Sequence, residues 1–323
     1  MMKKMTVMQA MSQGKGSVEL LGWVHRERHS NKLAFIVLRD ESNTVQCVIE
    51  KDKVPETVWN EALKAKIEAS IQVKGEIVKD ERAPTGFEVK VQGFKVIGIS
   101  EDFPITKDQS IEFLLDNRHL WLRSRRMTAI LKVRSTVFKA IHDYFGKAGF
   151  YEFQSPCLTS AAGESGSTQF KVDYFGEPMF LTQTWQLYAE AGVMALEKIY
   201  CIAPSFRAEP SKTSRHLTEY WHAEMEACWI DFNDLMDYAE GLFKHVATTV
   251  LNENKAELLE LKRDVSKLEP SLKKKFPRIT YDEALKLLKD KAGLEVVWGK
   301  DIRTIEEDEL YKLFDSPFFI TNF

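Results

Sequence analysis

The sequence lacks the features that mark secreted, membrane-spanning or polycationic proteins. Its four cysteines form no C-x-x-C pair and no Cys/His spacing of a metal site, so they predict reduced, at least partly buried thiols. No signal-like apolar segment starts the chain, and no apolar run approaches the length of a membrane span. The 45 basic residues nearly balance 48 acidic ones, which excludes a chain that is polycationic throughout. We therefore expect a cytoplasmic protein without a membrane partner.

Two segments depart from this overall charge balance. Residues 1–39 hold seven Lys or Arg against two acids, a local balance of +5, and residues 118–134 hold six Lys or Arg and no acid. Either segment could contact nucleic acid or could be an ordinary solvated face. At 323 residues and 44% hydrophobic content, the chain is long enough for two domains with their own cores.

Residues 17–99 alternate between apolar and polar positions in five short runs, and residues 55–67 read as a helix after the third run. Five strands with one helical insertion are typical of an oligonucleotide-binding (OB) barrel, although another small β-barrel would share the pattern. We expect this domain to cover residues 1–103. A polar linker with Pro104 would cover 104–116, and a second domain 117–323.

Residues 198–230 predict a long-looped antiparallel hairpin. Arg207 and Glu209 are two positions apart in the first run, and Glu224 and Glu226 are two apart in the second, so each pair shares a face. Since unpaired buried charges are costly, these groups should face a ligand, one another or water. A solvated sheet face with surface ion pairs is the alternative, but the cationic loop with Arg215 favours a polyphosphate ligand.

The string FRAEPSKTSRHLTEYWHAEMEA resembles motif 2 of the class II aminoacyl-tRNA synthetases, in particular the aspartyl/asparaginyl branch. The helical stripe around residues 130–145, followed by GFYEFQSPCL, resembles motif 1, which forms the dimer interface in that family; a plain core helix would explain the stripe equally well. GESGSTQF and LTQTWQLYAE resemble the amino-acid pocket, with Ser165 in place of a glycine and Thr184 in place of a serine. The resemblance implies an α+β protein, in which the OB barrel precedes a class II catalytic domain built on an antiparallel sheet.

The resemblance also implies a binding site for ATP, which enters with Mg²⁺. In this chemistry the amino-acid carboxylate attacks the α-phosphorus, so catalysis rests on positioning and charge stabilisation. Arg207 would be catalytic, bridging the carboxylate and the α-phosphate. Glu209 would accept from the adenine amino group, and Tyr220 would stack on adenine or simply pack in a core. The implied ATP-binding residues are Arg207, Ala208, Glu209, Arg215, His216, Leu217 and Tyr220.

The amino acid and the anticodon of tRNA would contact other residues. By the same resemblance, the amino-acid pocket comprises Glu164, Gln183, Gln186, Tyr188, Arg207 and Glu224. In the barrel, the anticodon would contact Arg26, Phe35, Gln46 and Glu88, with Phe35 stacking on a base. On its own, Phe35 would more simply be interpreted as a core aromatic. No metal ligand is identified in the sequence.

Glu224 decides between asparagine and aspartate. A carboxylate accepts hydrogen bonds from a side-chain amide and repels a second carboxylate, and the aspartyl branch generally has Asp at this position. The pattern Y-x-H-x-E-x-E at 220–226 resembles the archaeal/eukaryotic asparaginyl type, which implies an asparagine–tRNA ligase acting on asparagine, ATP and tRNA as a homodimer. An aspartyl-type ligase and a non-catalytic tRNA-binding paralogue are the alternatives.

The resemblance stops before motif 3, a G-x-G-x-G-x-E-R segment whose arginine contacts the phosphates of ATP. No glycine follows Gly299 and no arginine follows Arg303. We therefore expect an incomplete catalytic domain, either as a fragment or as a degenerate paralogue. Its final strand would leave the apolar residues Phe318, Phe319 and Ile320 exposed.

Overall fold

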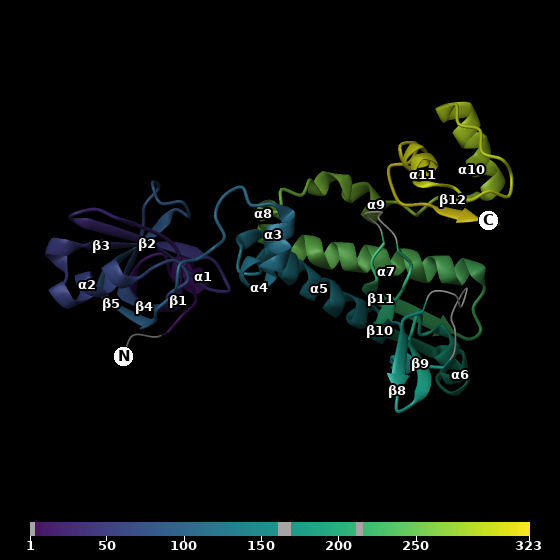
Figure 1. Ribbon diagram of the computed structural model, residues 1–323. Coiled ribbons are helices and arrows are strands. Elements are labelled where there is room, and N and C mark those ends of the chain that lie inside the picture. The colour runs from purple at the N-terminus through teal and green to yellow at the C-terminus, as the bar shows by residue number, and fades with distance from the viewer. Residues whose placement is uncertain (1–3, 161–168, 211–215) are drawn as a thin grey trace. The chain divides into compact units, whose positions relative to one another are not determined.

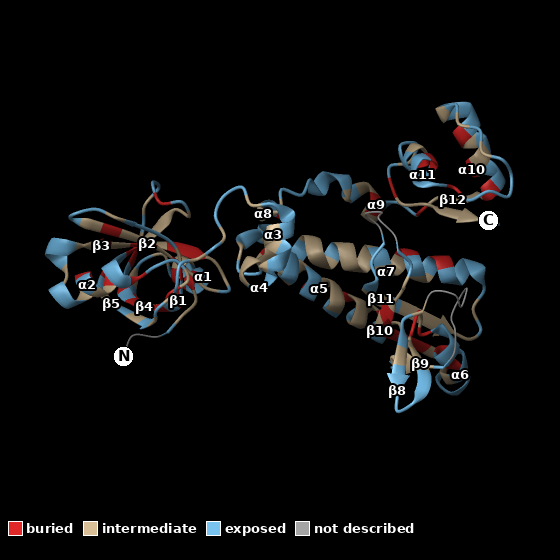
Figure 2. Cartoon of the chain, viewed as in Figure 1, coloured by how far each residue is buried: buried red, intermediate tan, exposed pale blue. Residues whose placement is uncertain are grey.

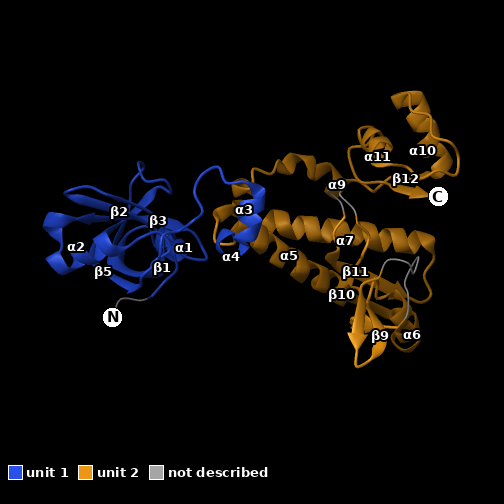
Figure 3. Ribbon diagram, in the orientation of Figure 1, with its two compact units in different colours: residues 1–121 blue, residues 122–323 orange. Residues whose placement is uncertain are grey.

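The computed structural model describes residues 4–160, 169–210 and 216–323 (Figure 1). The chain divides into two compact units, residues 1–121 and residues 122–323 (Figure 3). Residues 104–116, which the sequence predicts to be a linker, include the helix α3 (Ile111–Asp116), whose N-cap is Ser110. Among the described residues, no helix is both long and apolar enough to cross a lipid bilayer.

The first unit is a closed five-stranded barrel with the strand order β1-β2-β3-β5-β4. Its elements are α1 (Val7–Gln13), β1 (Gly16–His29), β2 (Leu33–Arg39), β3 (Thr44–Glu50), η1 (Lys51–Lys53), α2 (Glu56–Lys64), β4 (Ser70–Lys79) and β5 (Phe87–Gly98), followed by α3 and α4 (Arg118–Trp121). The helix α2 lies between the third and fourth strands, as the sequence predicted. The OB topology is therefore confirmed.

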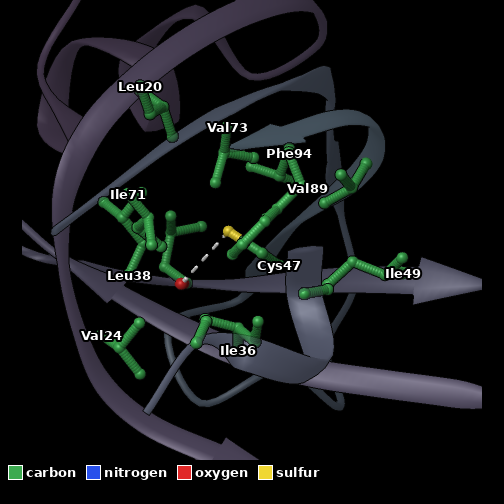
Figure 4. Packing of buried hydrophobic residues seen from close by; sticks show 14 of the residues in the cluster. Leu20, Val24, Ile36, Leu38, Cys47, Ile49, Ile71, Val73, Val89 and Phe94 are labelled. Carbon is green, nitrogen blue, oxygen red and sulfur yellow. Dashed lines mark hydrogen bonds between the residues drawn. The ribbon is translucent and has the colours of Figure 1, made fainter. Parts of the chain in front are cut away.

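Strict alternation along the strands builds the core of the barrel (Figure 4). In β2, Ala34, Ile36 and Leu38 are fully buried, while the residues between them are partly exposed. The Cys47 thiol lies in this core, and burial raises its pKa to about 12, so it is an inert packing group. Closure of the sheet leaves no free strand edge in the barrel, which favours independent stability.

Gly75 lies where β4 and β5 pass closely, and its replacement tests the barrel geometry. A Cβ at this position would be 2.2 Å from the carbonyl oxygen of Lys90, a backbone atom that cannot move aside. We expect Gly75→Ala to lower the free energy of unfolding by about 1–3 kcal/mol. Gly93→Ala is the matched control, because its Cβ would meet only the Lys74 side chain at 3.5 Å. Equal urea midpoints for the two variants would contradict this packing.

The second unit is α+β and contains three small sheets, with the orders β11-β10-β6, β7-β9-β8 and β12-β13. Its elements are α5 (Arg125–Lys147), β6 (Tyr151–Glu152), β7 (Leu158–Thr159), β8 (Lys171–Tyr174), β9 (Glu177–Leu181), α6 (Gln186–Leu196), β10 (Lys198–Phe206), β11 (Glu219–Ala227), α7 (Phe232–Glu253), α8 (Lys255–Glu260), η2 (Val265–Lys267), α9 (Glu269–Lys273), β12 (Arg278–Thr280), α10 (Tyr281–Leu287), η3 (Leu288–Ala292), α11 (Thr304–Tyr311) and β13 (Phe319–Thr321). The predicted hairpin is present as β10 and β11, which pair antiparallel along their full length.

The β10–β11 hairpin is covered by helices on both faces. On one face, Phe145 of α5 stacks on Tyr200 of β10, with ring centroids 4.7 Å apart, and α7 adds Tyr238 to the same cluster. On the other face, α6 packs Trp185, Ala189 and Val193 against Ile199, Cys201 and Ala203 of β10. Most of β10 is buried between these layers, whereas every residue of β11 is intermediate or exposed (Figure 2).

The buried stripe of α5 differs in part from the expected one. The most buried residues are Ala129, Thr136, Ala140 and Phe145. Ile130 and Leu131, which the sequence placed on the inner stripe, are 37% and 42% exposed. Three of these four buried residues are small, which lets α5 pack closely, and Phe145 fills the space against Tyr200.

The end of the chain packs better than the sequence predicted. β13 pairs in parallel with β12, and Phe318 and Ile320 pack against a cluster built on Tyr281, Leu288 and Leu310. The Phe319 ring lies 6.2 Å from that of Phe276. The expectation that these three residues would be exposed is wrong, because α10, η3 and α11 supply a local core that the sequence interpretation did not include.

Candidate active site

Four polar side chains, each partly buried, share one face of β11. Tyr220, His222, Glu224 and Glu226 alternate with Trp221, Ala223, Met225 and Ala227. The second set points to the helical layer, where Met225 and Ala227 join the α5–α7 cluster and Trp221 meets Phe138 edge-on at 5.5 Å. Because side chains alternate between the two faces of a strand, these polar residues lie on a single face of β11, as the sequence predicted.

Glu224 is the best-anchored residue of this surface. Its Oε1 accepts a short hydrogen bond from the Thr184 hydroxyl, and its Oε2 accepts from the Trp185 backbone N–H at 3.1 Å. The Nδ1 atom of His222 lies 3.2 Å from the same Oε2. The Glu224 side chain is only 14% exposed. A carboxylate held by these contacts keeps one orientation.

The start of α6 positions two of these donors. Thr184 and Trp185 precede the first helical turn, where backbone N–H groups have no partner inside the helix. The Trp185 ring is buried and donates from Nε1 to the carbonyl oxygen of Phe153 at 2.8 Å, which fixes the turn. The Thr184 hydroxyl also accepts from the Gln186 N–H at 3.2 Å. This end of the helix therefore favours an anion, and Glu224 is that anion.

Two polar atoms in the segments next to β10 and α6 are buried without a hydrogen-bond partner among the described residues. They are Oε1 of Gln183 and Nε of Arg207. Their segments are adjacent, because the Phe206 N–H donates to the carbonyl oxygen of Thr182 at 2.9 Å. A buried acceptor and a buried donor left open on one surface are typical of a site that completes its hydrogen bonds with a polar ligand.

Glu226 lies one strand repeat beyond Glu224. Burial raises the pKa of its carboxyl group, and the nearby carboxylates of Glu190 and Glu224 raise it further. Glu190, from α6, also accepts from Nε2 of Gln186 at 3.2 Å. The surface is therefore negative toward this end, which disfavours a second carboxylate there.

The structure brings Gln183, Gln186, Arg207, Tyr220 and Glu224 to the start of α6 and the adjoining hairpin. Arg207 follows the last residue of β10 and continues its pairing through a hydrogen bond from its N–H to Thr218. The segment containing Ala208 and Glu209 lies beyond the strand, and His216 and Leu217 precede β11. Glu164 and Arg215 lie outside the described residues.

The Tyr188 ring stacks on Phe153, with ring centroids 5.7 Å apart, and lines a cavity of about 290 Å³ together with Thr182 and Thr184. Since the Thr184 hydroxyl donates to Glu224, this cavity borders the Glu224 site, and the place of Tyr188 in the amino-acid pocket stays a prediction. The sequence interpretation did not identify Trp185 and His222 as neighbours of Glu224. The position of His222 in the Y-x-H-x-E alternation could have indicated its contact with Glu224. The backbone N–H of Trp185 could not be identified in this way, because almost every residue type carries one.

A second candidate site lies on the outer surface of the barrel. Across β1, β2, β3 and β5, the strand register aligns two rows, Arg26–Val37–Gln46–Glu88 and Arg28–Phe35–Val48–Lys90. Phe35 lies between the fully buried Ala34 and Ile36, so its side chain points outward and is half-buried. The interpretation of Phe35 as a core aromatic is therefore wrong. The four barrel residues predicted to contact an anticodon lie within these two adjacent rows.

Comparison with known proteins identifies the architecture. Residues 110–323 match the model of the tRNA synthetases class II (D, K and N), and residues 18–97 match that of the OB-fold nucleic acid binding domain. The asparagine–tRNA ligase of Thermoplasma acidophilum is 46% identical over 306 residues, which are 95% of this chain and 71% of that protein. The chain belongs to the asparaginyl-tRNA synthetase family.

Other members of this synthetase family agree in sequence and in fold. The asparagine–tRNA ligase of Thermococcus gammatolerans is 44% identical over 94% of this chain and 70% of its own length. The crystal structure of the Pyrococcus horikoshii asparaginyl-tRNA synthetase complexed with asparaginyl-adenylate superimposes with a TM-score of 0.91 at 39% identity. That match covers 99% of this chain and 74% of the other. The asparaginyl-tRNA synthetase of Entamoeba histolytica in complex with asparaginyl-adenylate superimposes with a TM-score of 0.79 at 30% identity. That match covers 94% of this chain and 71% of the other.

Proposed function

We propose that this chain carries the asparagine-selecting and tRNA-binding parts of an asparagine–tRNA ligase. The reaction joins asparagine to ATP, giving asparaginyl-adenylate and pyrophosphate, and then transfers the asparaginyl group to tRNA. The observation that carries this proposal is Glu224, a carboxylate that accepts from Thr184 and Trp185, lies 3.2 Å from Nδ1 of His222, and presents acceptors to an amide. It favours asparagine over the aspartyl-type alternative.

Arg207 is the residue that we assign to the chemical step. Its guanidinium follows β10 on the same surface as Glu224, and its Nε is a buried donor open to a ligand. A planar guanidinium can bridge the attacking carboxylate and the α-phosphate, neutralising charge as the oxygen–phosphorus bond forms and pyrophosphate leaves. Gln183, with its open acceptor, would hold the substrate ammonium together with Glu164.

ATP would occupy the adjoining end of the hairpin. Tyr220 presents an aromatic face beside His222, with ring centroids 5.2 Å apart, and suits stacking on adenine. Glu209 would accept from the adenine amino group, while Arg215 and His216 would hold the outer phosphates. We assign Mg²⁺ to the substrate as its ATP complex, and we place the reaction in the cytoplasm, where tRNA is charged.

The test of this function uses the chain extended through a class II motif 3 segment, called the extended chain below. We expect it to charge tRNA with asparagine and not with aspartate. Charging with aspartate instead would favour the aspartyl-type ligase. Absence of charging with either amino acid, combined with tRNA binding, would favour a non-catalytic paralogue.

Phe35 tests the barrel surface as the anticodon site. Its ring is flanked by Arg28 and Val48, and a base stacked on an aromatic ring contributes about 1–3 kcal/mol. We therefore expect Phe35→Ala to weaken binding of tRNA to residues 1–323 by that amount. Trp23→Ala is the control, because Trp23 is a barrel aromatic 47% exposed that lies outside the two rows. Equal loss in both variants, or no loss in Phe35→Ala, would contradict the anticodon assignment.

We also propose that the chain forms homodimers through α5 and β6. Tyr151 of β6 is 61% exposed, and Ile130 and Leu131 of α5 are exposed beside a buried stripe of small residues. Such apolar side chains suit an interface with a second copy. We expect sedimentation velocity to give a dimer for the parent chain and a shift toward monomer for Leu131→Glu. A monomeric parent at micromolar concentration would contradict this proposal.

A further inference from the structure

We propose that His222 is a positioning residue for asparagine selection. It completes the set of hydrogen-bond donors that hold Glu224, and these donors are then not available to bind aspartate. The inference rests on the proposed function and adds a residue to it. The Thr184 hydroxyl and the Trp185 backbone N–H donate to Glu224, and Nδ1 of His222 lies 3.2 Å from Oε2, where we assign it as the third donor. They come from two segments about forty positions apart that meet at one carboxylate.

The chemistry of the contact fixes the proton on His222. A carboxylate offers acceptors, so we assign the proton to Nδ1 of His222, 3.2 Å from Oε2 of Glu224. The Ser205 hydroxyl lies 3.3 Å from the same Nδ1, and with the proton on Nδ1 its oxygen would accept. Ser205 is buried on the neighbouring strand and holds the ring in register.

Counting acceptor sites identifies the atom left for the substrate. A carboxylate has about four lone-pair sites, two on each oxygen. Oε2 accepts from Trp185 N–H and lies 3.2 Å from Nδ1 of His222, while Oε1 accepts only from the Thr184 hydroxyl among the described residues. The second lone pair of Oε1 is the remaining acceptor, and we assign it to the side-chain amide of asparagine.

The same geometry explains how aspartate is refused. The carboxylate of aspartate needs donors, and the Thr184 hydroxyl and the Trp185 N–H already donate to Glu224. It would also meet the negative charge of Glu224, with Glu226 and Glu190 behind it. Without His222, Oε2 has one donor fewer, and Glu224 can rotate about the Thr184 and Trp185 contacts. A rotated carboxylate would release the Thr184 hydroxyl, a donor that aspartate could use.

The experiment compares His222→Phe, His222→Asn and His142→Phe in the extended chain. The readout is kcat/KM for asparagine and for aspartate in ATP–pyrophosphate exchange. Phenylalanine at position 222 keeps the ring volume but has no hydrogen-bond donor, whereas asparagine keeps a donor of similar reach. His142 is a control because it contacts Tyr200 on the opposite face of the β10–β11 hairpin. We expect His222→Phe to lower the preference for asparagine by about tenfold, through KM more than kcat, because one charge-assisted hydrogen bond is lost. His222→Asn and His142→Phe should stay within about threefold of the parent, and the KM for ATP should be unchanged in all variants.

An unchanged preference in His222→Phe would overturn the inference, and so would equal losses in His222→Phe and His222→Asn. A parent that exchanges with neither amino acid, or that prefers aspartate, would instead refute the proposed function. A second readout needs no activity. In residues 1–323 labelled with ¹⁵N-histidine, we expect His222 to show a protonated Nδ1 at neutral pH. An unprotonated Nδ1 would overturn the inference even if His222→Phe fails to fold.

Discussion

Replacing Glu224 with glutamine is expected to lower the preference of the extended chain for asparagine over aspartate by about 100-fold. Glutamine has the shape of glutamate but accepts at only one of its two terminal atoms. Its NH₂ group cannot accept from Thr184 on one side or from Trp185 and His222 on the other. At least one donor would turn toward the substrate, and the charge that repels aspartate would be gone.

The matched control for this variant is Glu226→Gln, the same substitution on the same strand face. The pKa of Glu226 is raised by burial and by its carboxylate neighbours, and no donor like those of Glu224 holds it among the described residues. We expect its preference to stay within about threefold of the parent, because the donors around Glu224 are untouched. ATP–pyrophosphate exchange with each amino acid measures both variants. If Glu224→Gln keeps the parent ratio, Glu224 is not the selector.

Residues 1–323 without a motif 3 segment are expected to activate asparagine at least about 100-fold more slowly than the extended chain. The hairpin supplies Arg207 and the loop after it, which form one side of an ATP site. The sequence contains no G-x-G-x-G-x-E-R segment to provide the phosphate-binding arginine of the other side. Losing one preorganised charge-stabilising donor typically costs about 10²–10³ in rate.

Binding of tRNA should survive in the same polypeptide. The barrel is closed, with its own buried core, and the rows around Phe35 do not depend on the second unit. Parallel measurements of pyrophosphate exchange and tRNA affinity on residues 1–323 and on the extended chain separate the two activities. Comparable exchange from both polypeptides would show that some other group completes the ATP site.

The sequence was most informative where side chains alternate. Period-two patterns predicted the barrel, its helical insertion α2 and the β10–β11 hairpin, because strand pleating sends neighbouring residues to opposite faces. The same rule placed Glu224 and Glu226 together. It also makes Phe35 an outward residue, since Ala34 and Ile36 on either side of it are buried.

Other features depend on tertiary packing that no local pattern encodes. Tyr188 was assigned to the amino-acid pocket, and its stacking on Phe153 beside the cavity that Thr184 also lines could not be read from residue type. Trp185 holds Glu224 through a backbone N–H, a group that every residue except proline carries. The packing of Phe318 and Ile320 depends on α10 and α11, whose apolar residues gather into a cluster only after the chain folds back through the β12–β13 pair.

The most direct test of this account is ATP–pyrophosphate exchange by the extended chain with asparagine and aspartate measured side by side. The Glu224 carboxylate lies at the start of α6 beside Thr184, Trp185 and His222. We therefore expect kcat/KM for asparagine to be at least about 100-fold above that for aspartate. Equal values, or a preference for aspartate, would contradict the assignment of Glu224 as the acceptor for the asparagine amide.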